Sequence, residues 1–153
     1  MEKPKDIETQ QLIESMNRTD FFTAFSDEEK REIITSYTPV CMFGKNESII
    51  KQGTDDTFFY ILLTGSARAI KNDVSLPFAE YGPGDSFGEI SFLTGVPRSC
   101  DVITNEVSIA LEIDKETLED LKIEIREKIK DRIIENLIER LRIMNNAFIS
   151  LFQ

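Results

Sequence analysis

The glycine and proline residues of this chain are confined almost entirely to its middle. All seven glycines lie between Gly44 and Gly95, and four of the five prolines lie between Pro39 and Pro97. Because these residues punctuate short strands and interrupt helices, the distribution predicts a β unit with many turns, flanked by helical segments on both sides. A chain of 153 residues is long enough for one such domain with helical extensions.

We expect three segments. The first is an N-terminal helical motif at 1–38, the second a β unit at 39–114, and the third a set of C-terminal helices at 115–153. The apolar spacing within the first segment predicts helices near 7–16 and 27–37.

A capping box precedes the second of these helices. Ser26 is followed three residues later by Glu29, and Phe25 is placed to form a hydrophobic staple. Phe21 and Phe22 lie just before it, and we expect these three aromatic residues to anchor the helical motif on the β unit.

The middle segment predicts eight short strands. They are expected near 40–44, 47–52, 57–63, 66–72, 75–81, 86–88, 99–104 and 107–113. The last of them alternates most regularly, with apolar residues at every second position from Val107 to Ile113. Short strands at regular spacing with glycine at the turns indicate an antiparallel β sandwich or barrel of the jelly-roll type.

The last segment predicts a short helix at 115–122 and a long one from Arg126 to about Phe148. Apolar residues on the long helix follow steps of three and four, at Ile134, Leu137, Leu141, Met144, Phe148 and Leu151. Such a seam is typical of a helix that pairs with a second copy, so a homodimer is one interpretation. The other is a helix packed on its own domain.

Composition narrows the possible partners. The chain has 18 basic and 28 acidic residues, a net charge of −10, which disfavours nucleic acid and anionic membrane surfaces. It has no histidine, the commonest metal ligand and usual general base, so we expect no metal site.

Cys41 and Cys100 have no zinc or redox spacing and are expected to be small buried side chains in a reducing compartment. Without a membrane-length apolar run or an apolar signal core, cytoplasmic localisation is expected.

One loop carries features of an anion site. Gly88 permits a tight exit from a strand, and the residues from Glu89 onward predict one turn of helix whose free N–H groups attract anions. Arg98 and Ser99 follow after a turn and supply a guanidinium fork and a hydroxyl, which suit a phosphate. Glu89 would accept a hydrogen bond from a sugar hydroxyl. The alternative is an ion pair between Glu89 and Arg98 that closes a surface loop.

The run FGEISFLTGVPRSCDV resembles the phosphate-binding cassette of the cyclic nucleotide-binding domain family, here at 87–100. The flanking segments IIKQGTDDTFFYILLTGSARAI and TDFFTAFSDEEKREI resemble that family's paired strands and its N-terminal helical motif. The resemblance covers residues 20–145. It implies an α+β fold: an eight-stranded antiparallel jelly-roll barrel with an N-terminal helical motif and a long C-terminal helix.

The resemblance also implies roles for single residues. Gly88, Glu89 and Ile90 would border the ribose and phosphate, with Glu89 accepting from the ribose 2′-OH. Arg98 would pair with the cyclic phosphate and Ser99 would hydrogen-bond it.

Two positions depart from the family pattern, because Ser91 and Cys100 stand where alanine is most common. Both side chains are small enough not to block the pocket, so we expect Ser91 and Cys100 to contact the ligand. Serine rather than threonine at position 99 favours cAMP over cGMP. Phe78 is placed where the family has apolar contacts to ligand.

The expected function is that of a stand-alone cAMP receptor. It would signal by repositioning its C-terminal helix and act through an unknown protein partner, with no cofactor besides its ligand. Two alternatives remain: a non-binding scaffold protein with the same fold, and a receptor for another phosphate ligand such as a cyclic dinucleotide. An enzyme is not expected, because the chain offers neither a Ser/His nor a Cys/His pair and no dinucleotide-binding glycine motif.

The long helix contains a further feature of interest. Asn145 and Asn146 interrupt its apolar pattern. They are expected to fix the register of a helix pair, to contact the ligand's base, or to be surface residues near a loose chain end.

Overall fold

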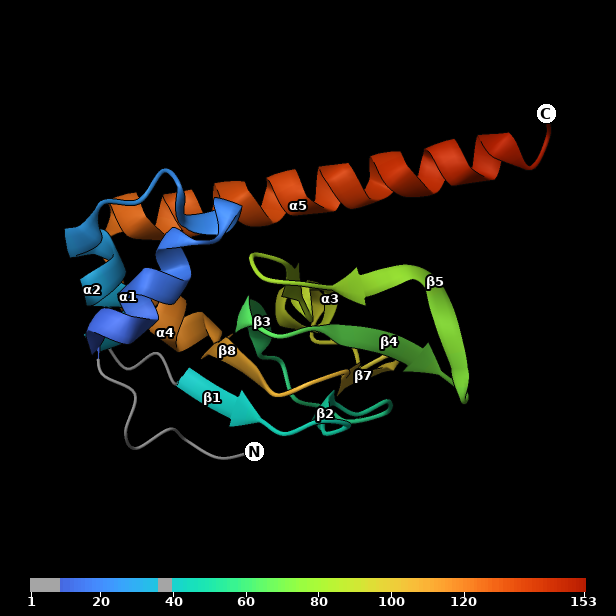
Figure 1. Ribbon diagram of the computed structural model, residues 1–153, viewed down its shortest axis with the longest axis horizontal. Helices are drawn as coiled ribbons and strands as arrows, with labels where there is room; N and C mark the ends of the chain where they lie inside the picture. The colour runs from blue at the N-terminus through green and yellow to red at the C-terminus, as the bar shows by residue number, and fades with distance from the viewer. Residues whose placement is uncertain (1–8, 36–39) are drawn as a thin grey trace.

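The computed structural model describes residues 9–35 and 40–153 (Figure 1). Its helices are α1 (Thr9–Asn17), the short 3-10 helix η1 (Asp20–Phe22), α2 (Asp27–Thr35), α3 (Glu89–Thr94), α4 (Lys115–Asp120) and α5 (Ile123–Ser150). Its strands are β1 (Val40–Phe43), β2 (Ser48–Ile50), β3 (Phe59–Thr64), β4 (Ala67–Lys71), β5 (Val74–Tyr81), β6 (Ser86–Phe87), β7 (Asp101–Thr104) and β8 (Ser108–Ile113).

Eight strands in the described residues form two four-stranded sheets, with the orders β1-β8-β3-β6 and β2-β7-β4-β5. All strand pairs are antiparallel. The predicted α+β fold of jelly-roll type is therefore confirmed, although the two sheets do not close into a continuous barrel. Each predicted strand is present, with ends shifted by at most two residues.

Strand β3 separates the two hydrophobic cores of the molecule. Phe59, Ile61 and Leu63 belong to the core formed with the helices, whereas Tyr60 and Leu62 belong to the core between the sheets. Successive side chains of a strand point to opposite faces, so a strand covered on both faces is apolar throughout. Strand β8 is also buried on both faces, which its simple alternation in the sequence does not indicate.

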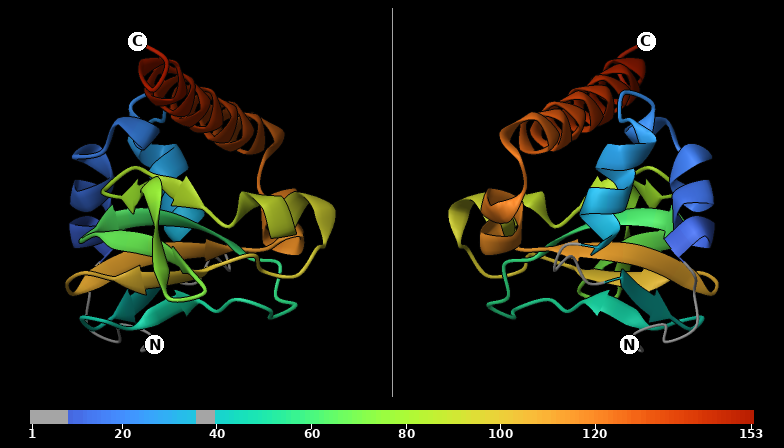
Figure 2. Two further views of the ribbon diagram at one scale, coloured as in Figure 1. Left: turned by 90° about the vertical axis from the view of Figure 1, so that its right-hand side faces the viewer. Right: turned by 90° about the vertical axis from the view of Figure 1, so that its left-hand side faces the viewer.

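The N-terminal motif is held as predicted. The Glu29 N–H donates to Ser26 Oγ at 3.1 Å, and the Ser26 N–H donates to Glu29 Oε1 at 2.9 Å, which confirms the capping box. Phe21, Phe22 and Phe25 are buried in the helix-side core. The helix ends predicted at 7 and 37 lie outside the described residues. Figure 2 shows α1 and α2 on one side of the sheets, α3 and α4 on the other, and α5 above them.

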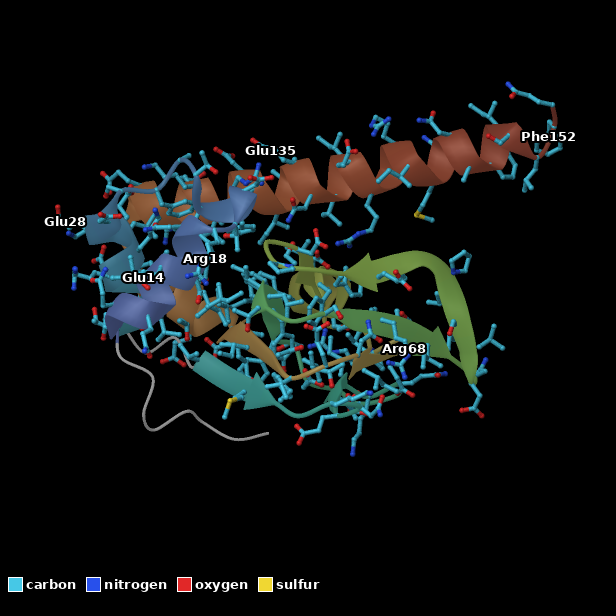
Figure 3. All side chains as sticks on the ribbon, in the orientation of Figure 1. Glu14, Arg18, Glu28, Arg68, Glu135 and Phe152 are labelled. Carbon is cyan, nitrogen blue, oxygen red and sulfur yellow. The ribbon has the colours of Figure 1, made fainter. Side chains whose placement is uncertain are left out.

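Helix α5 begins three residues earlier than predicted and has two unlike halves. Ile125, Ile129 and Ile133 are buried against the domain. Most of the residues of the predicted seam are exposed, and so are those at the chain end: Ile134, Leu141, Met144, Phe148, Leu151 and Phe152. Phe152 lies at the tip of the helix, away from the sheets (Figure 3). No helix in residues 9–35 and 40–153 is long and apolar enough to cross a bilayer.

Candidate functional site

A cavity of about 110 Å³ opens between the β6–α3 turn, the segment that follows α3, and α5. Its walls combine apolar side chains from the sheets with charged side chains from the turn and from α5. The lining residues are Ile50, Tyr81, Phe87, Gly88, Glu89, Ile90, Ser91, Arg98, Ser99, Cys100, Val102 and Arg140.

Gly88 permits the turn that begins this site. Its φ of 85° lies in the left-handed region that L side chains rarely adopt. A Cβ at this position would lie 3.0 Å from both Arg98 Nη1 and the Phe58 carbonyl oxygen. Glycine is therefore required for backbone conformation and for close approach of the guanidinium. Helix α3 starts directly afterwards, so its first N–H groups have no partner within the helix.

Arg98 is fixed by groups of the β unit. It is only 4% exposed. Its Nε and Nη2 donate to Asp56 Oδ1 at 3.2 and 2.5 Å, its Nη1 donates to the Gly88 carbonyl at 3.0 Å, and its Nη2 also donates to the Phe58 carbonyl. A guanidinium has five N–H donors, so these four hydrogen bonds leave one N–H, on Nη1, for a ligand.

Asp56 is the partner that orients Arg98. Burial alone would raise the pKa of this carboxyl, but hydrogen bonds from Arg98 and Thr54 outweigh it, and the pKa lies below its ordinary value. The carboxylate therefore stays ionised, and the guanidinium keeps a countercharge in the absence of any ligand.

Glu89 lines the same cavity and is also 4% exposed. Its Oε1 accepts from the Ser86 hydroxyl at 3.1 Å and lies 3.7 Å from Arg140 Nη1. Burial raises the pKa of Glu89 above its ordinary value, while its own backbone N–H and Arg140 act in the opposite direction. The carboxylate is thus a buried acceptor whose countercharge comes from α5.

The alternative interpretation, an ion pair between Glu89 and Arg98, is wrong. Arg98 pairs with Asp56, and Glu89 pairs with Arg140. The two residues instead contribute one acceptor and one donor to the same cavity.

Seven of the eight predicted ligand contacts line this cavity: Gly88, Glu89, Ile90, Ser91, Arg98, Ser99 and Cys100. Ile90 and Ser99 are exposed at its rim, whereas Ser91 is buried. The side chain of Phe78, the eighth, is outside the described residues. Cys100 is only partly buried, less than predicted, because it borders the open cavity. Cys41 is buried between the sheets, as predicted.

Three polar residues in or beside the site were not predicted: Arg140 lines the cavity, whereas Asp56 and Asn136 contact Arg98 and Ser86 next to it. Asn136 Nδ2 donates to the Gly84 carbonyl at 3.3 Å and lies 3.4 Å from Ser86 Oγ. The sequence could have indicated two of them only by their position along the helix. Asn136 and Arg140 continue the helix face that begins with the buried isoleucines of α5, where polar residues need partners. Asp56 stands beside Asp55 and looks like part of an ordinary acidic loop.

Asn145 and Asn146 are both exposed. Neither lines the cavity. The residue of α5 that lines it is Arg140, more than one helical turn earlier. Among residues 9–35 and 40–153 there is also no cluster of three cysteine, aspartate or glutamate side chains placed to hold a metal ion.

Comparison with known proteins gives a family for this architecture. The model of the cyclic nucleotide-binding domain matches residues 40–123. The cAMP-dependent protein kinase regulatory subunit of Yarrowia lipolytica is 30% identical over 107 residues, which are 69% of this chain and 28% of that protein. The chain thus spans less than a third of the length of this curated relative.

Solved structures share the fold at low identity. A cyclic nucleotide-binding domain from Methylobacillus flagellatus has a TM-score of 0.75 at 22% identity, over 93% of this chain and 83% of that one. The regulatory subunit of a cAMP-independent protein kinase A from Trypanosoma brucei has a TM-score of 0.66 at 19% identity, over 95% of this chain and 50% of that one. At such identities the likeness establishes the fold alone.

Proposed function

Since the chain belongs to the cyclic nucleotide-binding domain family, we propose that it binds a cyclic nucleotide, cAMP in the first instance, in the cavity beside α5. The observation that carries the proposal is that a buried guanidinium, Arg98, and a buried carboxylate, Glu89, line the same cavity. A fixed guanidinium suits a cyclic phosphate, and a buried carboxylate suits a ribose hydroxyl. A nucleotide is the ligand that needs both.

In this proposal Arg98 uses its remaining N–H for the phosphate, and Ser99 adds a hydroxyl at the rim. Glu89 accepts from the ribose 2′-OH. Gly88, Ile90 and Ser91 border the sugar and phosphate at the start of α3. Cys100 and Phe78 remain proposed contacts at the edges of the ligand.

We further propose that the protein is a regulatory receptor rather than an enzyme. Its segments would be the helical motif at 1–38, the nucleotide-binding β unit at 39–114, and a lid at 115–153 that changes position on binding and acts on a protein partner. Contact between α5 and the cavity through Arg140 supports the assignment of a lid.

A homodimer through the distal half of α5 belongs to the same proposal. The supporting observation is the exposure of Leu141, Met144 and Phe148 on one helix face. Sedimentation at several concentrations tests it. Replacing Leu141 and Phe148 by serine should shift the sedimentation coefficient toward the monomer, and an unchanged concentration-independent value for both proteins contradicts the dimer.

Calorimetric titration tests the proposed ligand. The protein is titrated with cAMP, cGMP and a cyclic dinucleotide, with 5′-AMP as the control that lacks the ring phosphate. Saturable binding of cAMP that is tighter than that of cGMP supports the proposal. Binding of the dinucleotide alone would make the protein a receptor of another phosphate ligand, and absence of binding to all would make it a scaffold.

A further inference from the structure

A further cavity, of about 280 Å³, lies where α3 and α4 meet α5. Figure 2 shows these two short helices next to each other, below the start of α5. Unlike the candidate site, this cavity exposes only apolar atoms on its wall. Six apolar side chains form most of the wall: Phe92, Leu93, Leu118, Ile133, Ile134 and Leu137. Glu89 and Lys130 also line it, through the methylene groups of their side chains.

The size and lining of this apolar cavity suit an apolar ligand. A cavity of about 150 Å³ lined by leucine, isoleucine and phenylalanine stays free of water and binds benzene. The present cavity has roughly twice that volume, so it has room for a chain of several methylene groups. Water gains no hydrogen bond from such a wall, and the hydrophobic effect therefore favours its replacement by an apolar group.

A basic cavity adjoins the apolar one. Its volume is about 490 Å³, and it shares four lining residues with the apolar cavity, Lys130 among them. Lys115, Arg126 and Lys130 line it, against a single acidic side chain, that of Glu119. In a chain whose net charge is −10, this local excess of positive charge suits an anionic group.

Arg126 and Lys130 make few contacts within the protein. Arg126 uses one of its five N–H groups in the described hydrogen bonds, a contact of 3.4 Å from Nη1 to the Glu119 carbonyl oxygen. Its Nε is buried and has no hydrogen-bond partner among the residues that the structure describes. Lys130 lies 3.7 Å from Glu127 in an exposed pair within α5, which contributes little. A guanidinium with unused N–H groups is well suited to a carboxylate or phosphate.

Two other occupants fit these cavities less well. The exposed tip of α5 in a second copy, from Ile143 to Phe152, is uncharged throughout. It would fill the apolar cavity and leave Arg126 and Lys130 without a countercharge. An anionic membrane surface would supply the charge, but the net charge of the chain repels it.

We propose that the two adjoining cavities bind a free single-chain amphiphile. Its apolar tail would lie between α3 and α5, and its carboxylate or phosphate head would lie at Arg126 and Lys130. Glu89 is the only residue that lines both this site and the cavity proposed for the nucleotide. Binding of the amphiphile therefore requires no nucleotide.

Calorimetric titration without nucleotide tests the site. The probes are octanoate, decanoate and decylammonium, each below the concentration at which it forms micelles. Each buried methylene should tighten binding about fourfold, so decanoate should bind about sixteenfold more tightly than octanoate. Decylammonium has the same tail and the opposite charge, and it should bind about tenfold more weakly than decanoate. Absence of binding, or an affinity that depends on neither chain length nor head charge, overturns the proposal.

Two matched pairs of variants locate the site. Ile134→Trp fills the apolar cavity, whereas Ile138→Trp adds the same ring at an exposed position of α5 that lines neither cavity. Arg126→Gln removes a charge at the proposed head group, and Arg142→Gln removes one from an exposed pair within α5. The first variant of each pair should weaken decanoate about tenfold, and the second should match the wild type. Equal effects within both pairs overturn the site.

Cosedimentation with phosphatidylglycerol vesicles separates a free ligand from a membrane. The wild type should stay in the supernatant. Vesicle binding that is lost in Arg126→Gln would make the site a membrane contact and would overturn the proposal. Binding of decanoate without binding of cAMP refutes only the function proposed above, whereas binding of cAMP without binding of decanoate refutes only this inference.

Discussion

Two buried charges line the cavity, each next to its countercharge, but the two pairs are built differently. Arg98, where the proposal places the phosphate, lies 2.5 Å from Asp56, and both residues belong to the β unit. Glu89, where the proposal places the sugar, lies 3.7 Å from Arg140, and the arginine comes from α5. The first pair lies within one unit, whereas the second joins the β unit to α5.

In the proposed function, this difference would separate affinity for the ligand from signalling through α5. A charge held by several hydrogen bonds within one rigid unit is pre-organised for its ligand. A longer pair between two elements is weaker, and it breaks when either element moves. If the protein binds a nucleotide as proposed, the pair at Arg98 is suited to hold the phosphate, and the pair at Glu89 is suited to report to α5 that the site is occupied.

Arg98→Ala should have the largest effect on binding. Loss of a buried charged partner is expected to weaken cAMP by about 2–4 kcal/mol in calorimetry. The free energy of unfolding should also fall, by about 1–3 kcal/mol, because the Gly88 and Phe58 carbonyls lose their donor. Arg98→Lys keeps the charge and serves as the milder variant. Unaltered affinity in Arg98→Ala would remove the phosphate role.

Asp56→Ala should have an intermediate effect, since it removes two of the four hydrogen bonds that orient Arg98. We expect a loss of about 1 kcal/mol in cAMP affinity, with Asp55→Ala as the matched control. The folded pKa of Asp56 is depressed, so its contribution to stability is present above the unfolded value of about 3.9 and is lost as pH falls through the folded pKa. Denaturant titrations at descending pH should show this loss in wild type and not in Asp56→Ala.

Glu89→Gln should weaken binding while leaving the fold intact or more stable. Affinity for cAMP should fall by about 1 kcal/mol, with 2′-deoxy-cAMP little affected. Burial raises the folded pKa of Glu89, so ionisation costs stability as pH rises from about 4.3 through the folded pKa.

The thermal midpoints of wild type and Glu89→Gln should accordingly agree at low pH and diverge at neutral pH, with the variant higher. A variant that is less stable at neutral pH would show that Arg140 and Ser86 more than offset the cost of burial.

Asn145→Ala should have the smallest effect. The residue is exposed and does not line the cavity, so affinity and stability should stay within about 0.5 kcal/mol of the wild type. Asn136→Ala is the comparison, because it removes two contacts with the β6 turn and should lower stability measurably. Equal effects of the two substitutions would mean that the distal part of α5 contacts the domain more than its exposure indicates.

Local rules explain what the sequence could predict. The positions of glycine and proline predicted the strands because a tight turn restricts which residues it accepts, and Ser26 with Glu29 predicted a helix start because capping acts over three residues. The loop from Gly88 to Cys100 was interpretable because its parts are close in the chain.

Contacts across long separations were not predictable in the same way. Arg140 is 54 residues from Ser86, and Arg98 is 42 residues from Asp56. The contact of Arg140 depends on where α5 crosses the sheets, and the contact of Asp56 depends on how the β2–β3 loop folds back. No local rule of sequence determines either. The same holds for the asparagines of α5. The sequence shows that Asn136, Asn145 and Asn146 are polar residues on an apolar helix, but the position at which α5 crosses the sheets decides that Asn136 is the one that contacts the β6 turn.

If α5 repositions as proposed, its two halves would make it act as a lever. The buried stretch that ends at Ile133 would be the fulcrum, and the part from there to Ser150 would be the moving arm. At 1.5 Å per residue, Arg140 lies about 10 Å from the fulcrum and Ser150 about 25 Å from it. A tilt that shifts Arg140 by about 1 Å therefore carries the tip about 2.5 Å, so the longest movement occurs where the helix exposes its aromatic residues.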